Sequence, residues 1–186
     1  MTYLYVRAEV QFLLMHESAA DIDEYLPTGP DSRIEVYLRS MAPTVGNDRQ
    51  MDCLRRFHRL AAAGNIESVS AHVWGDSIST HTPEITGLDN LLSTVGDIYS
   101  FSAENEPSVT PFFRVTRIDA SIPGESFERI VPPQCAMLCY EGETLVGVFP
   151  CFIEGNSVTP MDALERLEAK VGVEVAESVD VSSQTN

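Results

Sequence analysis

The sequence is nearly without lysine and is short of positive charge altogether. Lys170 is the single lysine, and 12 basic residues stand against 28 acidic ones, which gives a formal net charge of −16. Such an acidic surface holds water and cations, while charge repulsion at molar salt is screened over about 3 Å. We interpret this balance as adaptation to a salt-rich cytoplasm, typical of a halophilic microbe. At ordinary salt it disfavours DNA and anionic membranes, because phosphate contacts dominate nucleic-acid affinity.

Long hydrophobic runs are also absent. The apolar stretch "FLLM" near the N-terminus is far too short to span a bilayer, and no small-residue cleavage pattern follows it. We therefore predict a cytoplasmic protein that has no contact with the membrane. In a reducing compartment its four cysteines are expected to be free thiols.

Recognisable catalytic and metal motifs are missing. The sequence contains no Gly-rich phosphate loop, no Gly-x-Ser-x-Gly turn, and no His-x-His or Glu-x-x-His spacing. With 28 acidic residues, any pair of carboxylates that resembles an acid/base pair is expected by chance. We expect no enzyme activity, no metal and no cofactor.

The length of 186 residues suits one domain with a core of its own. Residues 1–32 combine a predicted strand with an acidic stretch that Pro and Gly interrupt, so they are expected to form an N-terminal appendage. Residues 33–173 are predicted to be a single domain. Residues 174–186 are expected to be a disordered tail.

Hydrophobic periodicity from Arg33 onward predicts the order β-α-β-α-β-β-β-α. Strands are predicted over 33–41, 66–75 and 110–119, two more within 134–152, and helices over 48–63, 82–105 and 160–171. Helices of this length between strands favour crossover connections. The predicted fold is therefore α+β, a mixed sheet with helices packed mainly on one face, either ferredoxin-like or a related sandwich.

The few basic residues are concentrated on the first predicted helix. Arg49, Arg55, Arg56 and Arg59 fall within eleven positions and share one arc of the helix, opposite its apolar side. One interpretation is a surface that grips phosphate or carboxylate groups of a nucleic acid or a protein partner. The other, which we favour, is a solvated outer face on which Asp52 pairs with Arg55 and Arg56.

The cysteines offer a further hypothesis, a thiol or metal site built from Cys135, Cys139 and Cys151. Cys135 and Cys139 lie on one face of a predicted strand, about 13 Å apart. A three-residue hairpin loop would place Cys135 opposite Cys151, where the two thiols form a disulfide or contribute to a metal site. Buried thiols within the core are the more usual outcome.

Three segments resemble a group of small haloarchaeal proteins: residues 33–75, then "LCYEGETLVGVFPC" and "VTPMDALERLE". The resemblance covers about residues 33–171. These proteins are often labelled as helix-turn-helix domain proteins, and the label implies DNA binding and transcriptional control. The expected function is thus a small DNA-associated regulator that forms homo-oligomers. The alternatives are a protein–protein adaptor that binds no nucleic acid, or the thiol or metal protein described above.

Overall fold

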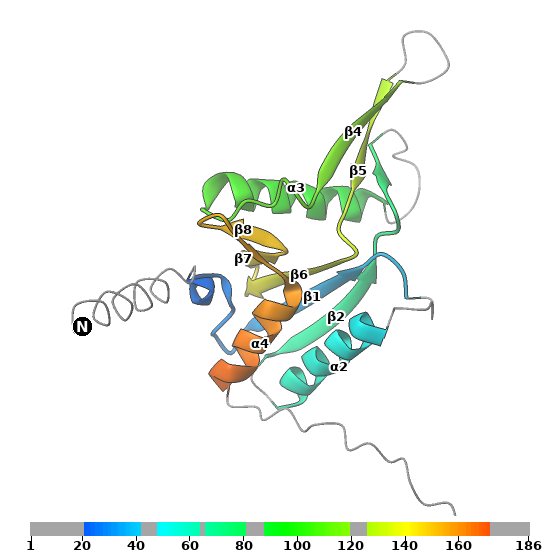
Figure 1. Cartoon of the computed structure of the whole chain (residues 1–186). Helices are drawn as coiled ribbons and strands as arrows, with labels where there is room; N and C mark the ends of the chain where they lie inside the picture. Colours follow the sequence, from blue (N-terminus) through cyan, green and yellow to red (C-terminus); the bar gives the residue numbers. More distant parts are fainter. Residues whose placement is uncertain (1–20, 42–47, 64–65, 81–87, 120–125, 172–186) are drawn as a thin grey trace, which may run out of the picture.

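The computed structural model describes residues 21–41, 48–63, 66–80, 88–119 and 126–171 (Figure 1). Its centre is a four-stranded mixed sheet in the order β2-β1-β6-β7. Strand β1 (Ser32–Leu38) pairs in parallel with β2 (Ser68–Val73) and antiparallel with β6 (Cys135–Glu141). Strand β7 (Thr144–Phe149) completes the sheet by pairing antiparallel with β6. These four strands were all predicted, because each carries alternating or continuous apolar residues.

The first crossover distinguishes this fold from the ferredoxin-like one. Helix α2 (Asp48–Ala62) connects β1 to β2, and these two strands lie directly beside each other. In the split βαβ unit of a ferredoxin-like sheet, another strand lies between them. The fold is α+β, as predicted, and it is a related sandwich rather than the ferredoxin-like one.

Helices cover both faces of this sheet, with two on one side. The Leu38 side faces α2, because Cys135 pairs with Leu38 in the sheet and contacts Cys53 of α2. Helix α4 (Pro160–Val171) lies against α2 on that side. Helix α3 (Leu88–Glu104) covers the opposite face, where the Tyr37 hydroxyl lies 3.4 Å from that of Thr94. The helices are thus mainly on one face, as predicted.

Alternation along the strands fills the core between these layers. The largest fully buried side chains come from all layers, and they include Ile34, Leu38, Phe57, Leu60, Ile98, Phe113, Met137, Phe149 and Leu164. Burying a side chain of this size contributes about 1.5–3 kcal/mol. The periodic apolar positions therefore account for both the elements and their packing.

Four strands were absent from the predicted order: β3 (Ile78–Ser79), β5 (Ser126–Val131), β8 (Cys151–Ile153) and β9 (Asn156–Val158). Strand β5 is the middle strand of a second sheet in the order β3-β5-β4, beside β4 (Arg114–Asp119). Prolines and a glycine flank β5, so its sequence resembles a connector. Its strand conformation depends on pairing with β4, which lies seven residues upstream.

Residues 21–31 pack on the domain, although the sequence assigned them to the appendage. The 3₁₀ helix η1 (Ile22–Tyr25) buries Tyr25, and Leu26 after it is 2% exposed. Gly147 in β7 makes this approach possible, since a Cβ there would lie 1.9 Å from the Tyr25 carbonyl oxygen. The packed structure therefore begins before the predicted boundary at residue 32. The predicted N-terminal strand and the C-terminal tail lie outside the described residues.

Candidate nucleic-acid interface

The exposed side of α2 retains two of the four predicted arginines. Arg55 and Arg59 are both exposed, and Arg55 Nη2 lies 3.4 Å from Asp52 Oδ1. This is one of the two pairings expected of a solvated face. Arg59 lies in the last turn of α2, where a cation is favoured by the helix dipole. The side chain of Arg49 lies outside the described residues.

Arg56 is turned inward and does not belong to that exposed side. Its Nε donates to Glu168 Oε1 at 3.0 Å and its Nη2 donates to Oε2 at 2.5 Å. The two side chains are only 12% and 6% exposed. The hydrogen bonds to Glu168 raise the pKa of Arg56. Arg56 thus holds α2 against α4 and leaves the predicted contact surface, because its guanidinium is buried and donates to Glu168 and to the Met161 sulfur.

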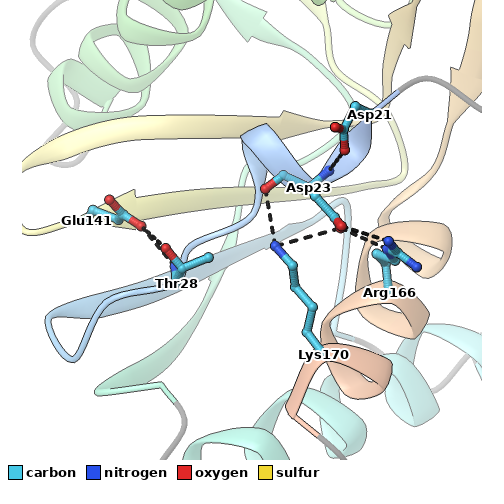
Figure 2. A network of polar contacts seen from close by, with 6 residues as sticks. All are labelled: Asp21, Asp23, Thr28, Glu141, Arg166 and Lys170. Atoms are coloured by element: carbon cyan, nitrogen blue, oxygen red, sulfur yellow. Dashed lines mark hydrogen bonds and ion pairs between the residues drawn. The ribbon is translucent and has the colours of Figure 1, made fainter.

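The basic residues of α4 are also engaged within the chain (Figure 2). Arg166 donates to both carboxylate oxygens of Asp23, at 2.7 and 2.6 Å. Lys170 Nζ lies 3.7 Å from Asp23 Oδ1 and donates to the Asp23 carbonyl oxygen. The hydrogen bond from Arg166 lowers the pKa of Asp23. These contacts hold η1 against α4.

A second contact in Figure 2 holds the segment after η1 against β6. The backbone N–H of Thr28 donates to Glu141 Oε1 at 2.8 Å, and the Thr28 hydroxyl donates to the same oxygen at 3.0 Å. These hydrogen bonds lower the pKa of Glu141. The charged groups drawn in Figure 2 thus serve the packing of residues 21–31.

Sequence reasoning missed another pair of arginines, Arg114 in β4 and Arg129 in β5. Both side chains are exposed, and neither has an ion-pair partner among the described residues. Strand β4 was predicted, but β5 was not, so nothing placed Arg129 beside it. Recognition of β5 as the partner strand would have revealed the pair.

The cysteines do not form the pair of Cys135 with Cys151 that the alternative hypothesis required, and three of the four are buried, the outcome expected as more usual. All four are free, and the thiol of Cys135 forms a hydrogen bond with Cys53 rather than meeting Cys151. The hairpin has a two-residue loop, and an irregularity after Cys139 restores the register that a three-residue loop would give, so that Met137 pairs with Phe149. Strand β7 ends at Phe149, however, and Cys151 lies in β8. Within the described residues, no three His, Cys, Asp or Glu side chains are grouped to hold a metal ion.

The environments of these thiols separate them into two pairs. The hydrogen bond with Cys135 lowers the pKa of Cys53 and raises that of Cys135. Burial raises the pKa of Cys151 to about 12. Burial also raises the pKa of Cys139, and the neighbouring Cys151 thiol raises it further. Protonated, buried thiols of this kind pack as small apolar groups.

His72 and Trp74 lie on one side of the sheet, with Tyr37 between them. The rings of Tyr37 and His72 stack with centroids 4.8 Å apart, and those of Tyr37 and Trp74 at 5.1 Å. Burial raises the pKa of Tyr37 to about 12. The three rings form a stacked row.

Comparison with known proteins was made with family models, with curated proteins and with solved structures. Searches of curated proteins and of solved structures find no significant match. Among the described residues, no helix has the length and apolar character needed to cross a bilayer.

The described helices are not arranged as a helix-turn-helix motif. Strands separate α2, α3 and α4 from one another, so none of these three helices follows another through the short turn of a helix-turn-helix motif. A family model described as a helix-turn-helix domain nevertheless matches residues 27–172, most of the chain. The chain therefore belongs to this helix-turn-helix domain family.

Proposed function

We propose that this protein is a DNA-associated transcriptional regulator in the cytoplasm of a halophilic archaeon, and that it acts by binding rather than by catalysis. The observation that carries the proposal is the family match over residues 27–172. The acidic composition supports the halophilic origin, since the net charge of −16 suits molar salt.

The exposed part of α2 is the contact that we propose from the sequence-predicted arginines. Arg55 and Arg59 are four positions apart, so they lie on one side of the helix. The pair between Arg55 and Asp52 is exposed and contributes little, so a phosphate readily displaces it. Arg59 has no ion pair among the described residues. Each arginine supplies a contact to one phosphate.

The test is a titration of the purified full chain with sheared duplex DNA, followed by fluorescence anisotropy over a range of salt concentrations. Arg55→Ala with Arg59→Ala is expected to weaken binding and to reduce the slope of log K against log salt by about two. Arg55→Lys with Arg59→Lys is the matched control, because it keeps both charges. No binding by the unaltered chain at any salt would overturn the proposed function. Unchanged binding by the alanine variant would overturn the α2 contact alone.

A second candidate function is a protein–protein adaptor, and the edge of the main sheet favours it. Strand β2 ends the described sheet, and Val73 within it is 46% exposed. An open edge of this kind pairs with a strand of another chain. Co-purification from the host with and without nuclease separates the two functions. DNA that is lost on nuclease treatment supports the regulator, whereas a protein partner that survives it, with no DNA, supports the adaptor.

A further inference from the structure

Two cysteine side chains meet where α2 lies against the beginning of β6. Cys53 is on the buried side of α2, one turn before Phe57, and it is 4% exposed. Cys135 is the first residue of β6 and is only partly buried. Their thiols form a hydrogen bond, so the two sulfur atoms are in direct contact in the reduced chain. We call these two residues the Cys53–Cys135 pair.

The packing around the Cys53–Cys135 pair holds both thiols in place. Cys135 is paired with Leu38 in the sheet, and Leu38 is fully buried. On the helix side, Phe57 is fully buried, and Arg56 is bound to Glu168 of α4 through two hydrogen bonds. These contacts fix α2 against the sheet. A bond between the two sulfur atoms therefore needs little further ordering of the chain.

The surroundings of Cys53 favour its thiolate, which is the reactive form of a cysteine. The hydrogen bond that the Cys135 thiol donates lowers the pKa of Cys53 despite its burial, and the nearby Arg56 guanidinium lowers it further. The same hydrogen bond raises the pKa of Cys135, which keeps its proton. One member of the pair is thus suited to attack an oxidant, while the other remains protonated beside it.

The other two cysteines differ from this pair in both respects. Cys139 and Cys151 have no exposed surface, and burial raises the pKa of both thiols. They therefore stay protonated and out of reach of a solute. The partial exposure of Cys135, by contrast, leaves the Cys53–Cys135 pair open to a molecule as small as hydrogen peroxide.

We propose that the Cys53–Cys135 pair is a peroxide-sensitive site, and that its oxidation forms a disulfide that joins α2 to β6. First, the Cys53 thiolate sulfur attacks one oxygen of hydrogen peroxide. An S–O bond forms and the O–O bond breaks, and the hydroxide that leaves recovers from solvent the proton that Cys53 had lost, which gives water.

The second step resolves the Cys53 sulfenic acid. The Cys135 sulfur attacks the Cys53 sulfur, an S–S bond forms and the S–O bond breaks, and the hydroxide that leaves takes the Cys135 proton. Two thiols and one hydrogen peroxide thus give one disulfide and two waters, and the peroxide accepts the two electrons that the thiols lose.

This site goes beyond the proposed function and does not depend on it. The disulfide joins the helix that carries Arg55 and Arg59 covalently to the central sheet, and a thiol reductant reverses it. Because Cys53 and Cys135 are far apart in the sequence, the bond closes a long loop in the unfolded chain. It is therefore expected to stabilise the oxidised chain against unfolding.

The first experiment treats the reduced full chain with a small excess of hydrogen peroxide, removes the excess, unfolds the chain and alkylates the remaining thiols for mass spectrometry. Two of the four thiols are expected to escape alkylation, and peptide fragmentation is expected to place the disulfide between Cys53 and Cys135. Cys53→Ala and Cys135→Ala are each expected to form no disulfide within the chain. Cys139→Ala is the matched control, and it is expected to form the same disulfide as the unaltered chain.

The second measurement is thermal unfolding before and after oxidation. The Tm of the unaltered chain is expected to rise by about 5 °C or more, and dithiothreitol is expected to reverse the rise. With Cys53→Ala the same treatment is expected to leave Tm unchanged. Four alkylated thiols after treatment, a disulfide that involves Cys139 or Cys151, or oxidation of Cys53 that stops at a sulfinic acid would each overturn the proposal. The assignment in the unaltered chain decides it, however well the variants fold.

Discussion

Arginine has opposite roles in two regions of this molecule. One is the packed side formed by η1, α2 and α4, and the other is the second sheet, in the order β3-β5-β4. On the packed side, Arg56 is 12% exposed and bound to Glu168 through two hydrogen bonds. On the second sheet, Arg114 and Arg129 are exposed. The difference arises because α2 has a helix packed against it, whereas β4 and β5 project from the body. In a chain with 12 basic residues, the surroundings of each arginine decide whether it stabilises the fold or is free to bind a ligand.

The largest loss of stability is expected from Arg56→Ala. The change leaves the Glu168 carboxylate buried without its partner, and breaking a buried pair in this way costs about 3–5 kcal/mol. Denaturant unfolding at constant salt measures it. Arg56→Met combined with Glu168→Leu is expected to recover most of the loss, since it removes both buried charges. A loss below about 1 kcal/mol for Arg56→Ala would mean that the pair does not hold α2 against α4.

Gly147→Ala is expected to have the next largest effect. Its Cβ would meet the Tyr25 carbonyl oxygen, a backbone atom, so η1 or β7 must shift. Overpacking of this kind costs about 1–3 kcal/mol. Gly96→Ala is the matched control, because nothing lies within 4 Å of a Cβ at that helical position. There we expect a gain of about 0.5–1 kcal/mol, because alanine favours a helix over glycine. Equal stability of Gly147→Ala and the unaltered chain would contradict the packing of η1.

The smallest effect on this side is expected from Asp23→Asn, and it depends on pH. The hydrogen bond from Arg166 lowers the pKa of Asp23 below its ordinary value of 3.8. The carboxylate therefore contributes stability above that value, and the contribution is lost as the pH falls through the folded-state pKa. We expect a drop of roughly 2 °C in Tm at pH 7 that shrinks below about pH 4.

Thermal unfolding between pH 3 and pH 7 measures this difference. Asp31→Asn is the control, because Asp31 is exposed and its side chain has no ion pair among the described residues. A difference between Asp23→Asn and the unaltered chain that persists unchanged to pH 3 would show that charge on Asp23 is not its cause.

Local signals were enough to predict much of the fold. The apolar periodicity of α2 gave its extent to within one residue, and Thr159 before Pro160 gave the start of α4. The backbone of Asp162 donates to the Thr159 hydroxyl, and Thr159 donates in return to the Asp162 carboxylate, which is a reciprocal cap. Such signals depend only on residues close together in the sequence, so they can be recognised without knowledge of the tertiary structure.

The candidate interface was predicted only in part, because its remaining members depend on distant partners. Arg56 lies at the edge of the polar arc of α2, and only the position of Glu168, 112 residues later, turns it inward. The thiol of Cys135 likewise contacts Cys53 between the sheet and α2, and the spacing of the cysteines in the sequence does not predict this contact. Arg129 joins Arg114 only because β5 pairs with β4.

The sequence by itself determined the acidic surface, the free cysteines, the α+β class and the main helices and strands, because charge and hydrophobic periodicity act locally. Only the tertiary structure decided which arginines are buried, that residues 21–31 dock through Gly147, and that the pairing of β5 with β4 brings Arg129 close to Arg114. These outcomes depend on close packing between segments far apart in the chain, where one carbonyl or one carboxylate sets the environment of its neighbour.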